Sequence, residues 1–239
     1  MSSTRLPGKV LKTASGRTML DRMLERVRKA ATVDQVVVAT TIDPSDDGLV
    51  RACRRYGAEV YRGSLPDVLD RYYQAAKRYQ ADIIVRLTGD CPLIDPQLID
   101  EVVNALIAKQ VDFSCNRLPP PFSRSYPIGL DVEACTFAAL ENAWLHANQI
   151  HEREHVLPYL YAVPGRFKVL QLNHEEDFGH LRWTLDTPED LVLLRRIYRY
   201  FKGGNDFSWL NILHLWREKP EMFEVNAQVV HKSYLDNEK

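Results

Sequence analysis

Short apolar runs alternate with amphipathic segments along most of the chain. Residues 18–30 carry apolar side chains at helical spacing, whereas residues 35–40 (QVVVAT) form a continuous apolar run. Such a run is typical of a strand buried on both faces of a parallel sheet. Further helices are expected at about 44–56, 66–79, 96–109, 136–147, 152–163, 187–201 and 207–217, and strands at 59–61, 82–87, 111–115, 129–134, 168–172 and 181–183. This alternation predicts an α/β fold with right-handed βαβ crossovers.

Composition narrows the class of protein. The 239 residues are 45% hydrophobic, and 31 basic residues balance 32 acidic ones to a net charge of -1. This balance argues against a broad basic face for nucleic acid or membrane binding. The chain has neither a signal-peptide pattern nor an apolar run long enough to span a bilayer. Its four cysteines form no CxxC pair, so we expect reduced thiols in a cytoplasmic protein.

The segment Ser3-Thr4-Arg5-Leu6-Pro7-Gly8-Lys9 is a candidate polyphosphate loop. Arg5 offers a planar fork to phosphate oxygens and Lys9 a point charge. Gly8 lets backbone N–H groups approach an anion. A solvated basic tail would have the same composition, so this alternative stays open.

Two aspartates follow predicted strands. Asp90 lies in Thr88-Gly89-Asp90, after the strand 82–87, and Asp186 follows the strand 181–183. Ligands of open α/β sheets bind beyond the carboxyl ends of strands, and Mg²⁺ prefers one or two carboxylates plus substrate phosphates. Each aspartate could instead cap the next helix. We assign those caps to Asp95 and Thr187, which leaves Asp90 and Asp186 for a metal.

Residues 151–155 (HEREH) match the literal HExxH zinc motif. We discount a zinc protease, because no third ligand stands at the usual spacing and the pattern is that of an α/β fold. Recognition of a polar substrate is one interpretation of this charged segment. A solvated start of a helix is the other.

Six blocks in order resemble nucleotide-sugar cytidylyltransferases of the spore-coat polysaccharide type, relatives of the CMP-sugar-acid synthetases that use acylneuraminate or 3-deoxy-manno-octulosonate. The blocks are STRLPGKVL (3–11), RGSLPDVLDRYY (62–73), DIIVRLTGDCPLIDP (82–96), YPIGLDVE (126–133), EREHVLPYLY (152–161) and LRWTLDTPEDL (181–191). The resemblance implies a Rossmann-like nucleotide-diphospho-sugar transferase fold with a mostly parallel three-layer sheet. It also implies a nucleotidyltransferase that activates a sugar or sugar acid with CTP and Mg²⁺, releasing pyrophosphate for surface polysaccharide biosynthesis.

By this resemblance, Arg5 and Lys9 grip the triphosphate while Asp90 and Asp186 hold Mg²⁺. The nucleotide side would be completed by Ser3, Thr4, Gly8, Asp70, Arg71, Thr88 and Gly89. The acceptor sugar would lie near Tyr126, Asp131, Arg153, Glu154 and His155. A homodimer formed through residues 126–173 is implied in the same way.

The start of the chain departs from the family pattern, in which a buried strand precedes the Ser-Thr-Arg loop. We therefore expect that the first strand, roughly ten residues with its turn, is absent before Met1. Residues 1–202 would form the nucleotidyltransferase domain and 203–239 a helical extension with a tail. A metal-dependent glycosyltransferase that uses a nucleotide sugar and an inactive truncated homologue are the alternatives.

Overall fold

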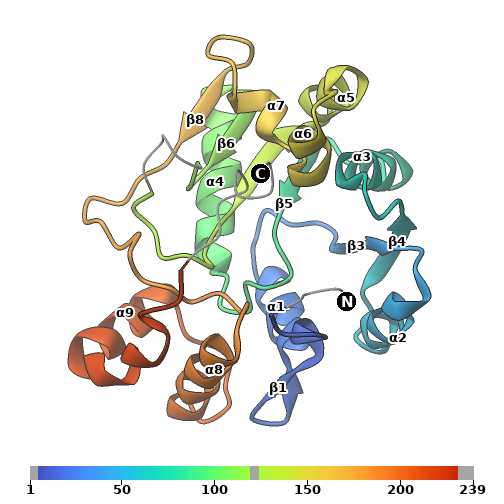
Figure 1. Ribbon diagram of the computed structural model, residues 1–239. Helices are drawn as coiled ribbons and strands as arrows, with labels where there is room; N and C mark the ends of the chain where they lie inside the picture. Colours follow the sequence, from blue (N-terminus) through green and yellow to red (C-terminus); the bar gives the residue numbers. More distant parts are fainter. Residues whose placement is uncertain (1–4, 119–123, 231–239) are drawn as a thin grey trace.

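The computed structural model describes residues 5–118 and 124–230 (Figure 1). The strands are β1 (Thr13–Ala14), β2 (Arg17–Thr18), β3 (Val37–Thr41), β4 (Glu59–Gly63), β5 (Ile83–Arg86), β6 (Phe113–Cys115), β7 (Glu133–Thr136) and β8 (Val169–Gln171). The α-helices are α1 (Met19–Val27), α2 (Asp47–Arg55), α3 (Val68–Arg78), α4 (Pro96–Lys109), α5 (Phe137–His146), α6 (Ile150–His155), α7 (Pro158–Tyr161), α8 (Pro188–Tyr200) and α9 (Trp209–Glu218). Short 3-10 helices are η1 (Lys9–Leu11), η2 (Pro44–Asp46), η3 (Pro220–Met222) and η4 (Glu224–Asn226).

The central strands form a mixed sheet that is mostly parallel in strand direction, because β5, β6 and β8 run the same way. Its order is β5-β7-β6-β8, and β7 pairs antiparallel with both neighbours while β6 and β8 are parallel. Strands β3 and β4 form a separate parallel pair, in register from Val37↔Glu59 to Thr41↔Gly63. Within the described residues, β3 and β5 each pair along one edge only. The α/β fold class is confirmed, with β7 as the strand that runs against the others.

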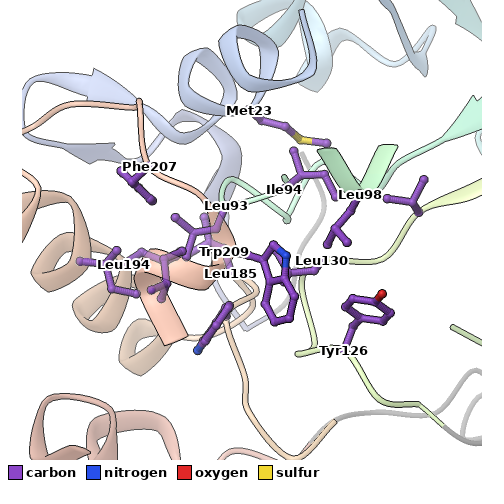
Figure 2. Packing of buried hydrophobic residues seen from close by; sticks show 14 of the residues in the cluster. Met23, Leu93, Ile94, Leu98, Tyr126, Leu130, Leu185, Leu194, Phe207 and Trp209 are labelled. Carbon is purple, nitrogen blue, oxygen red and sulfur yellow. The ribbon is translucent and has the colours of Figure 1, made fainter. Parts of the chain in front are cut away.

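Helices cover both faces of the four-stranded sheet. Successive residues of β5 point to opposite faces, since Ile84 belongs to a cluster with α3, α5 and α7 whereas Ile83 packs against a cluster built by α1, α4, α8 and α9. Figure 1 shows the first group of helices at the top of the view, and α1, α8 and α9 at the bottom. The larger cluster also holds Phe207, Trp209 and Ile212, so α9 packs into the same core as α8 (Figure 2).

Hydrogen-bonding side chains start the helices beside the candidate site. Asp95 Oδ1 accepts from Gln97 N and caps α4, as expected. Thr187 caps α8 in a capping box, in which the N–H of Asp190 donates to Thr187 Oγ1 and the N–H of Thr187 donates to Asp190 Oδ2. Because Asp95 and Thr187 cap these two helices, neither Asp90 nor Asp186 serves as a cap.

Three expected elements differ in the structure. Residues 129–132 are not a strand, because Gly129 has a φ of +105° and the N–H of Leu130 closes a turn to the Pro127 carbonyl. Residues 181–183 form a single bridge, Ile128↔Arg182, in place of a strand. The helix expected at 152–163 is divided into α6 and α7 around Val156, whose φ is +74°. None of the helices in the described ranges is long and apolar enough to cross a bilayer.

Candidate active site

The loop before η1 is fixed by Leu6, which is buried in the core, and by Gly8, whose backbone lies in the left-handed region. Leu6 is buried in the larger hydrophobic cluster. Gly8 adopts a φ of +65°, a conformation that a glycine enters without strain, and its carbonyl accepts from Leu11 N. This geometry fixes where Lys9 leaves the loop. Ser3 and Thr4, also expected at the nucleotide, lie outside the described residues.

Lys9 joins two carboxylates that are far apart in the sequence. Its Nζ lies 2.6 Å from Asp90 Oδ2 and 2.7 Å from Asp186 Oδ1. Burial by itself lowers the pKa of Lys9, but the charges of Asp90 and Asp186 outweigh burial and the pKa is raised. The three side chains keep between 16% and 24% of their surface exposed, so small ligands reach them from solvent.

Asp186 is surrounded by cations. Arg182 donates to its Oδ2 at 2.9 Å, and the guanidinium of Arg5 lies 3.4 Å from the same oxygen. Burial opposes ionisation, yet Lys9 and Arg182 lower the pKa of Asp186 to about 2. The carboxylate is therefore ionised throughout the neutral range.

Backbone contacts bring the segments of Asp90 and Asp186 together. The Asp90 carbonyl accepts from Leu185 N at 2.9 Å and from Thr184 Oγ1 at 3.0 Å. Gly129 packs directly beneath this segment, because a Cβ atom on it would lie 2.7 Å from Thr184 N. Thr88 closes the other side of the Asp90 turn, where its carbonyl accepts from Cys91 N and its hydroxyl contacts Cys91 Sγ. Gly89 is the exposed residue of that turn.

The sequence did not reveal the partners of Asp186. In the sequence, Asp190 falls within the predicted helix 187–201 and Arg182 within the predicted strand 181–183. Arg182 donates through Nε and Nη2 to both oxygens of Asp190, at 2.9 and 2.8 Å. The spacing from Thr187 to Asp190 is that of a capping box, which is a local signal for Asp190. The need for Arg182 follows from the burial of Asp190 in the structure, since a buried charge needs a counter-charge.

The donor set suits a divalent cation bound together with phosphates. Two carboxylates share one cation, the Lys9 ammonium, and oxygen donors are what Mg²⁺ prefers. No cluster of three or more histidine, cysteine or acidic side chains suited to a metal occurs in residues 5–118 and 124–230. Asp90 and Asp186 therefore fit a metal whose remaining ligands come from substrate and water.

Asp70 and Arg71, expected at the nucleotide, make contacts within the protein. Asp70 accepts from Trp144 Nε1 at 2.9 Å, which ties α3 to α5. Arg71 is buried, donates to the Ser64 carbonyl, and has its pKa lowered by burial. A nucleotide contact for either residue stays a prediction.

The residues expected at the sugar divide into two groups. Tyr126 is 6% exposed and packs edge-on against Trp209, so it is part of the core (Figure 2). Asp131 receives two hydrogen bonds from Arg124, at 2.8 and 2.9 Å, with Arg117 3.6 Å away. Burial and then the charge of Asp90 raise the pKa of the Cys91 thiol, and the charge of Asp131 adds to this effect. Sugar binding by Tyr126 and Asp131 stays a prediction.

The segment 151–155 forms α6 and is not a metal site. Glu152 Oε2 accepts from the N–H groups of Asn148 and Gln149, so it caps the helix and does not act as a base. Arg153 forms an ion pair with Asp67 at the start of α3, at 2.5 Å. Glu154 is exposed, and burial lowers the pKa of His155. Sugar binding by Arg153, Glu154 and His155 stays a prediction.

Comparison with known proteins gives relatives over most of the chain. An uncharacterised protein of Methanocaldococcus jannaschii is 38% identical, covering 99% of this chain and 95% of that protein. The spore coat polysaccharide biosynthesis protein SpsF of Bacillus subtilis is 31% identical over 92% of both. A 3-deoxy-manno-octulosonate cytidylyltransferase of Geobacter metallireducens is 40% identical over 45% of this chain and 41% of that enzyme.

Solved structures and a family model give the same class. A cytidylyltransferase from Leptospira borgpetersenii superposes with a TM-score of 0.88 at 35% identity, covering 97% of this chain and 95% of that one. A CMP:2-keto-3-deoxy-manno-octonic acid synthetase complexed with CTP shares the fold, with a TM-score of 0.62 at 20% identity over 83% and 94%. The model of the cytidylyltransferase family matches residues 1–201. The chain belongs to the cytidylyltransferase family.

Proposed function

We propose that this enzyme transfers a cytidylyl group from CTP to a sugar acid, with Mg²⁺, and releases pyrophosphate for polysaccharide biosynthesis. The observation that carries the proposal is the meeting of Arg5, Lys9, Asp90 and Asp186 from three distant segments. The relatives named for sugar-acid activation and spore-coat polysaccharide support the substrate class.

The residues would act by position and charge. A sugar hydroxyl oxygen attacks the α-phosphorus of CTP, the bond from that phosphorus to the bridging oxygen breaks, and pyrophosphate leaves with those electrons while the hydroxyl proton passes to water. Arg5 and Lys9 bind phosphate oxygens and stabilise the charge that grows on the leaving group. Asp90 and Asp186 would hold the metal, which when bound neutralises phosphate charge.

Lys9 must exchange partners when substrate arrives. Its ammonium joins both carboxylates in the structure, so it leaves them as phosphate oxygens bind. Arg182 stays on Asp186 because it is also held by the buried Asp190.

The four cysteines bear on where the protein is located. They are buried free thiols, which supports the expectation of a reducing, cytoplasmic location: Cys53, Cys91, Cys115 and Cys135.

Pyrophosphate release tests the proposal. The enzyme is incubated with Mg²⁺ and each of the four nucleoside triphosphates, against a panel of sugar acids and sugar phosphates. We expect pyrophosphate with CTP and a sugar acid, and none when the acceptor is omitted. Release of a nucleoside diphosphate from a nucleotide sugar, without pyrophosphate from CTP, would show a glycosyltransferase and contradict the proposal.

A further inference from the structure

A buried polar network runs from the C-terminal turn η4 to the carboxylate of Asp186. Asn226 of η4 is 4% exposed, and its Nδ2 donates to Asp190 Oδ1 at 2.8 Å and to the Arg182 carbonyl at 3.0 Å. Asp190 is fully buried and Arg182 nearly so. Asn226, Asp190 and Arg182 are therefore shielded from water, and the network meets solvent at Asp186.

Asp190 is the junction of the network. Its Oδ1 accepts from Arg182 and Asn226, and its Oδ2 accepts from Arg182 and from the N–H groups of Asp186 and Thr187. Burial alone would raise the pKa of Asp190, but the hydrogen bonds from Arg182 and Asn226 keep it below its usual value. One carboxylate thus holds both the backbone of Asp186 and the guanidinium that orients its side chain.

The C-terminal turn is fastened to the core independently of Asn226. Phe223 is 6% exposed and its ring packs 6.5 Å from that of the buried Trp183, while Arg196 donates to the Met222 carbonyl. The turn η4 also packs against α8. Removing the Asn226 amide should therefore leave the turn in place and loosen the network alone.

From these contacts we infer that Asn226 is a positioning residue, which fixes the Asp186 carboxylate through Asp190 and Arg182. The inference rests on the proposed function, in which Asp186 serves the metal–triphosphate site. Its physical basis is that groups behind a ligand hold it in one orientation, and their loss typically costs about 10- to 100-fold in affinity or activity. Asp190 Oδ1 accepts from Arg182 and Asn226 together, so the Asn226 amide helps to keep this oxygen, and with it the Arg182 guanidinium, in one orientation.

The chain offers a matched control for the loss of a buried amide. Asn205 is also 4% exposed, and its Nδ2 donates to the Arg22 carbonyl and to Glu25 Oε2. It thus holds an arginine carbonyl and a carboxylate, as Asn226 does, within a network of other residues. Asn205→Ala and Asn226→Ala should lower the unfolding temperature by similar amounts, since each removes two hydrogen bonds donated by a buried amide, one of them to a carboxylate.

The two variants are compared by calorimetric titration of CTP with and without Mg²⁺ and by crystal structures. We expect Asn226→Ala to weaken the Mg²⁺-dependent part of CTP affinity by about tenfold and to show a displaced Asp186 carboxylate. Asn205→Ala should stay within about twofold of the parent protein, with Asp186 in place. If Asn226→Ala fails to fold, Asn226→Ser replaces it, because serine keeps one hydrogen-bond donor. Asn226→Ser should weaken the Mg²⁺-dependent CTP affinity and displace Asp186 in the same direction, but by less.

The outcomes separate this inference from the proposed function. An unmoved Asp186 and unchanged affinity in Asn226→Ala overturn the inference even if the parent protein turns over CTP. A parent protein that binds no CTP with Mg²⁺ overturns the proposed function. A displaced Asp186 in the Asn226→Ala crystal still supports the positioning role in that case.

Discussion

Two charged regions of this protein look equally promising in sequence and behave differently in the structure. The charges of residues 151–155 are satisfied nearby: Glu152 caps its own helix and Arg153 pairs with Asp67. Lys9, Asp90 and Asp186 come from three separate segments and meet with their charged ends together. The contacts of residues 151–155 are explained by capping and helix packing. The second region instead gathers two carboxylates with Lys9, Arg5 and Arg182 at one partly exposed place, where a ligand can exchange with them.

The largest expected effect comes from removing a charge of the convergent cluster. Asp90→Asn and Asp186→Asn should each lower the rate of pyrophosphate release by about 100- to 1000-fold, because the metal and phosphates lose a fixed charge. Asp177→Asn, in an exposed loop, is the control and should leave the rate unchanged. A rate within tenfold of the parent protein in both site variants would break the comparison between the two regions.

Lys9 should affect metal binding and catalysis in opposite directions. Lys9→Met should slow turnover by about 100-fold, because a phosphate loses its cation. The same variant should bind Mn²⁺ more tightly in the absence of nucleotide, because the ammonium no longer joins Asp90 to Asp186. Electron paramagnetic resonance measures the free Mn²⁺, and Lys12→Met, at an exposed lysine directly after η1, is the control. Equal Mn²⁺ affinity in both variants would mean that Lys9 does not occupy the metal position.

Gly129 tests whether the segment that carries Asp186 depends on close packing. Gly129 and Gly165 both have a positive φ, but an added Cβ would crowd Thr184 only at Gly129 and meets nothing within 4 Å at Gly165. Gly165→Ala should cost about 1 kcal/mol of unfolding free energy from backbone strain, and Gly129→Ala about 3 kcal/mol or more. Chemical denaturation measures the unfolding free energy of both variants, and an equal loss in the two would contradict the packing argument. Turnover should fall about tenfold in Gly129→Ala only, since a misplaced group weakens alignment of the reactants.

The smallest effect is expected at Arg153. Arg153→Met breaks its ion pair with Asp67 and should lower the unfolding free energy by about 1 kcal/mol, since the pair is partly exposed. The guanidinium also donates to the Trp144 carbonyl of α5, and a steady-state series for the sugar acid tests whether it contacts substrate as well. A KM within about twofold of that of the parent protein would assign the guanidinium to Asp67 and Trp144 alone, and a larger rise would support the sugar contact that the resemblance implies.

Much of the fold, and the meeting of Lys9 with Asp90 and Asp186, could be predicted from the sequence. Most buried strands and helix starts carry local signals, and the Asp95 and Thr187 caps were assigned correctly. Asp90 and Asp186 could be singled out because each follows a predicted strand and is not needed as a helix cap, although the strand predicted at 181–183 is a single bridge in the structure. The direction of β7 could not be predicted, because a buried strand has the same pattern whichever way it runs.

The residues behind the site were harder to find. Arg182, Asp190 and Asn226 interact across 8 to 44 positions of sequence separation, and each has an ordinary local interpretation. Tyr126 shows the converse, because the resemblance implies a sugar contact while the structure packs its ring into the core. Side-chain partners of this kind depend on tertiary packing, which local patterns do not encode.

A crystal structure of the enzyme with CTP and Mn²⁺ tests the central claim most directly. The account predicts an anomalous Mn²⁺ peak in contact with both Asp90 and Asp186, and Lys9 moved from the carboxylates to the phosphates. A bound triphosphate with Lys9 still joining the two carboxylates, or with Mn²⁺ held elsewhere, would contradict it.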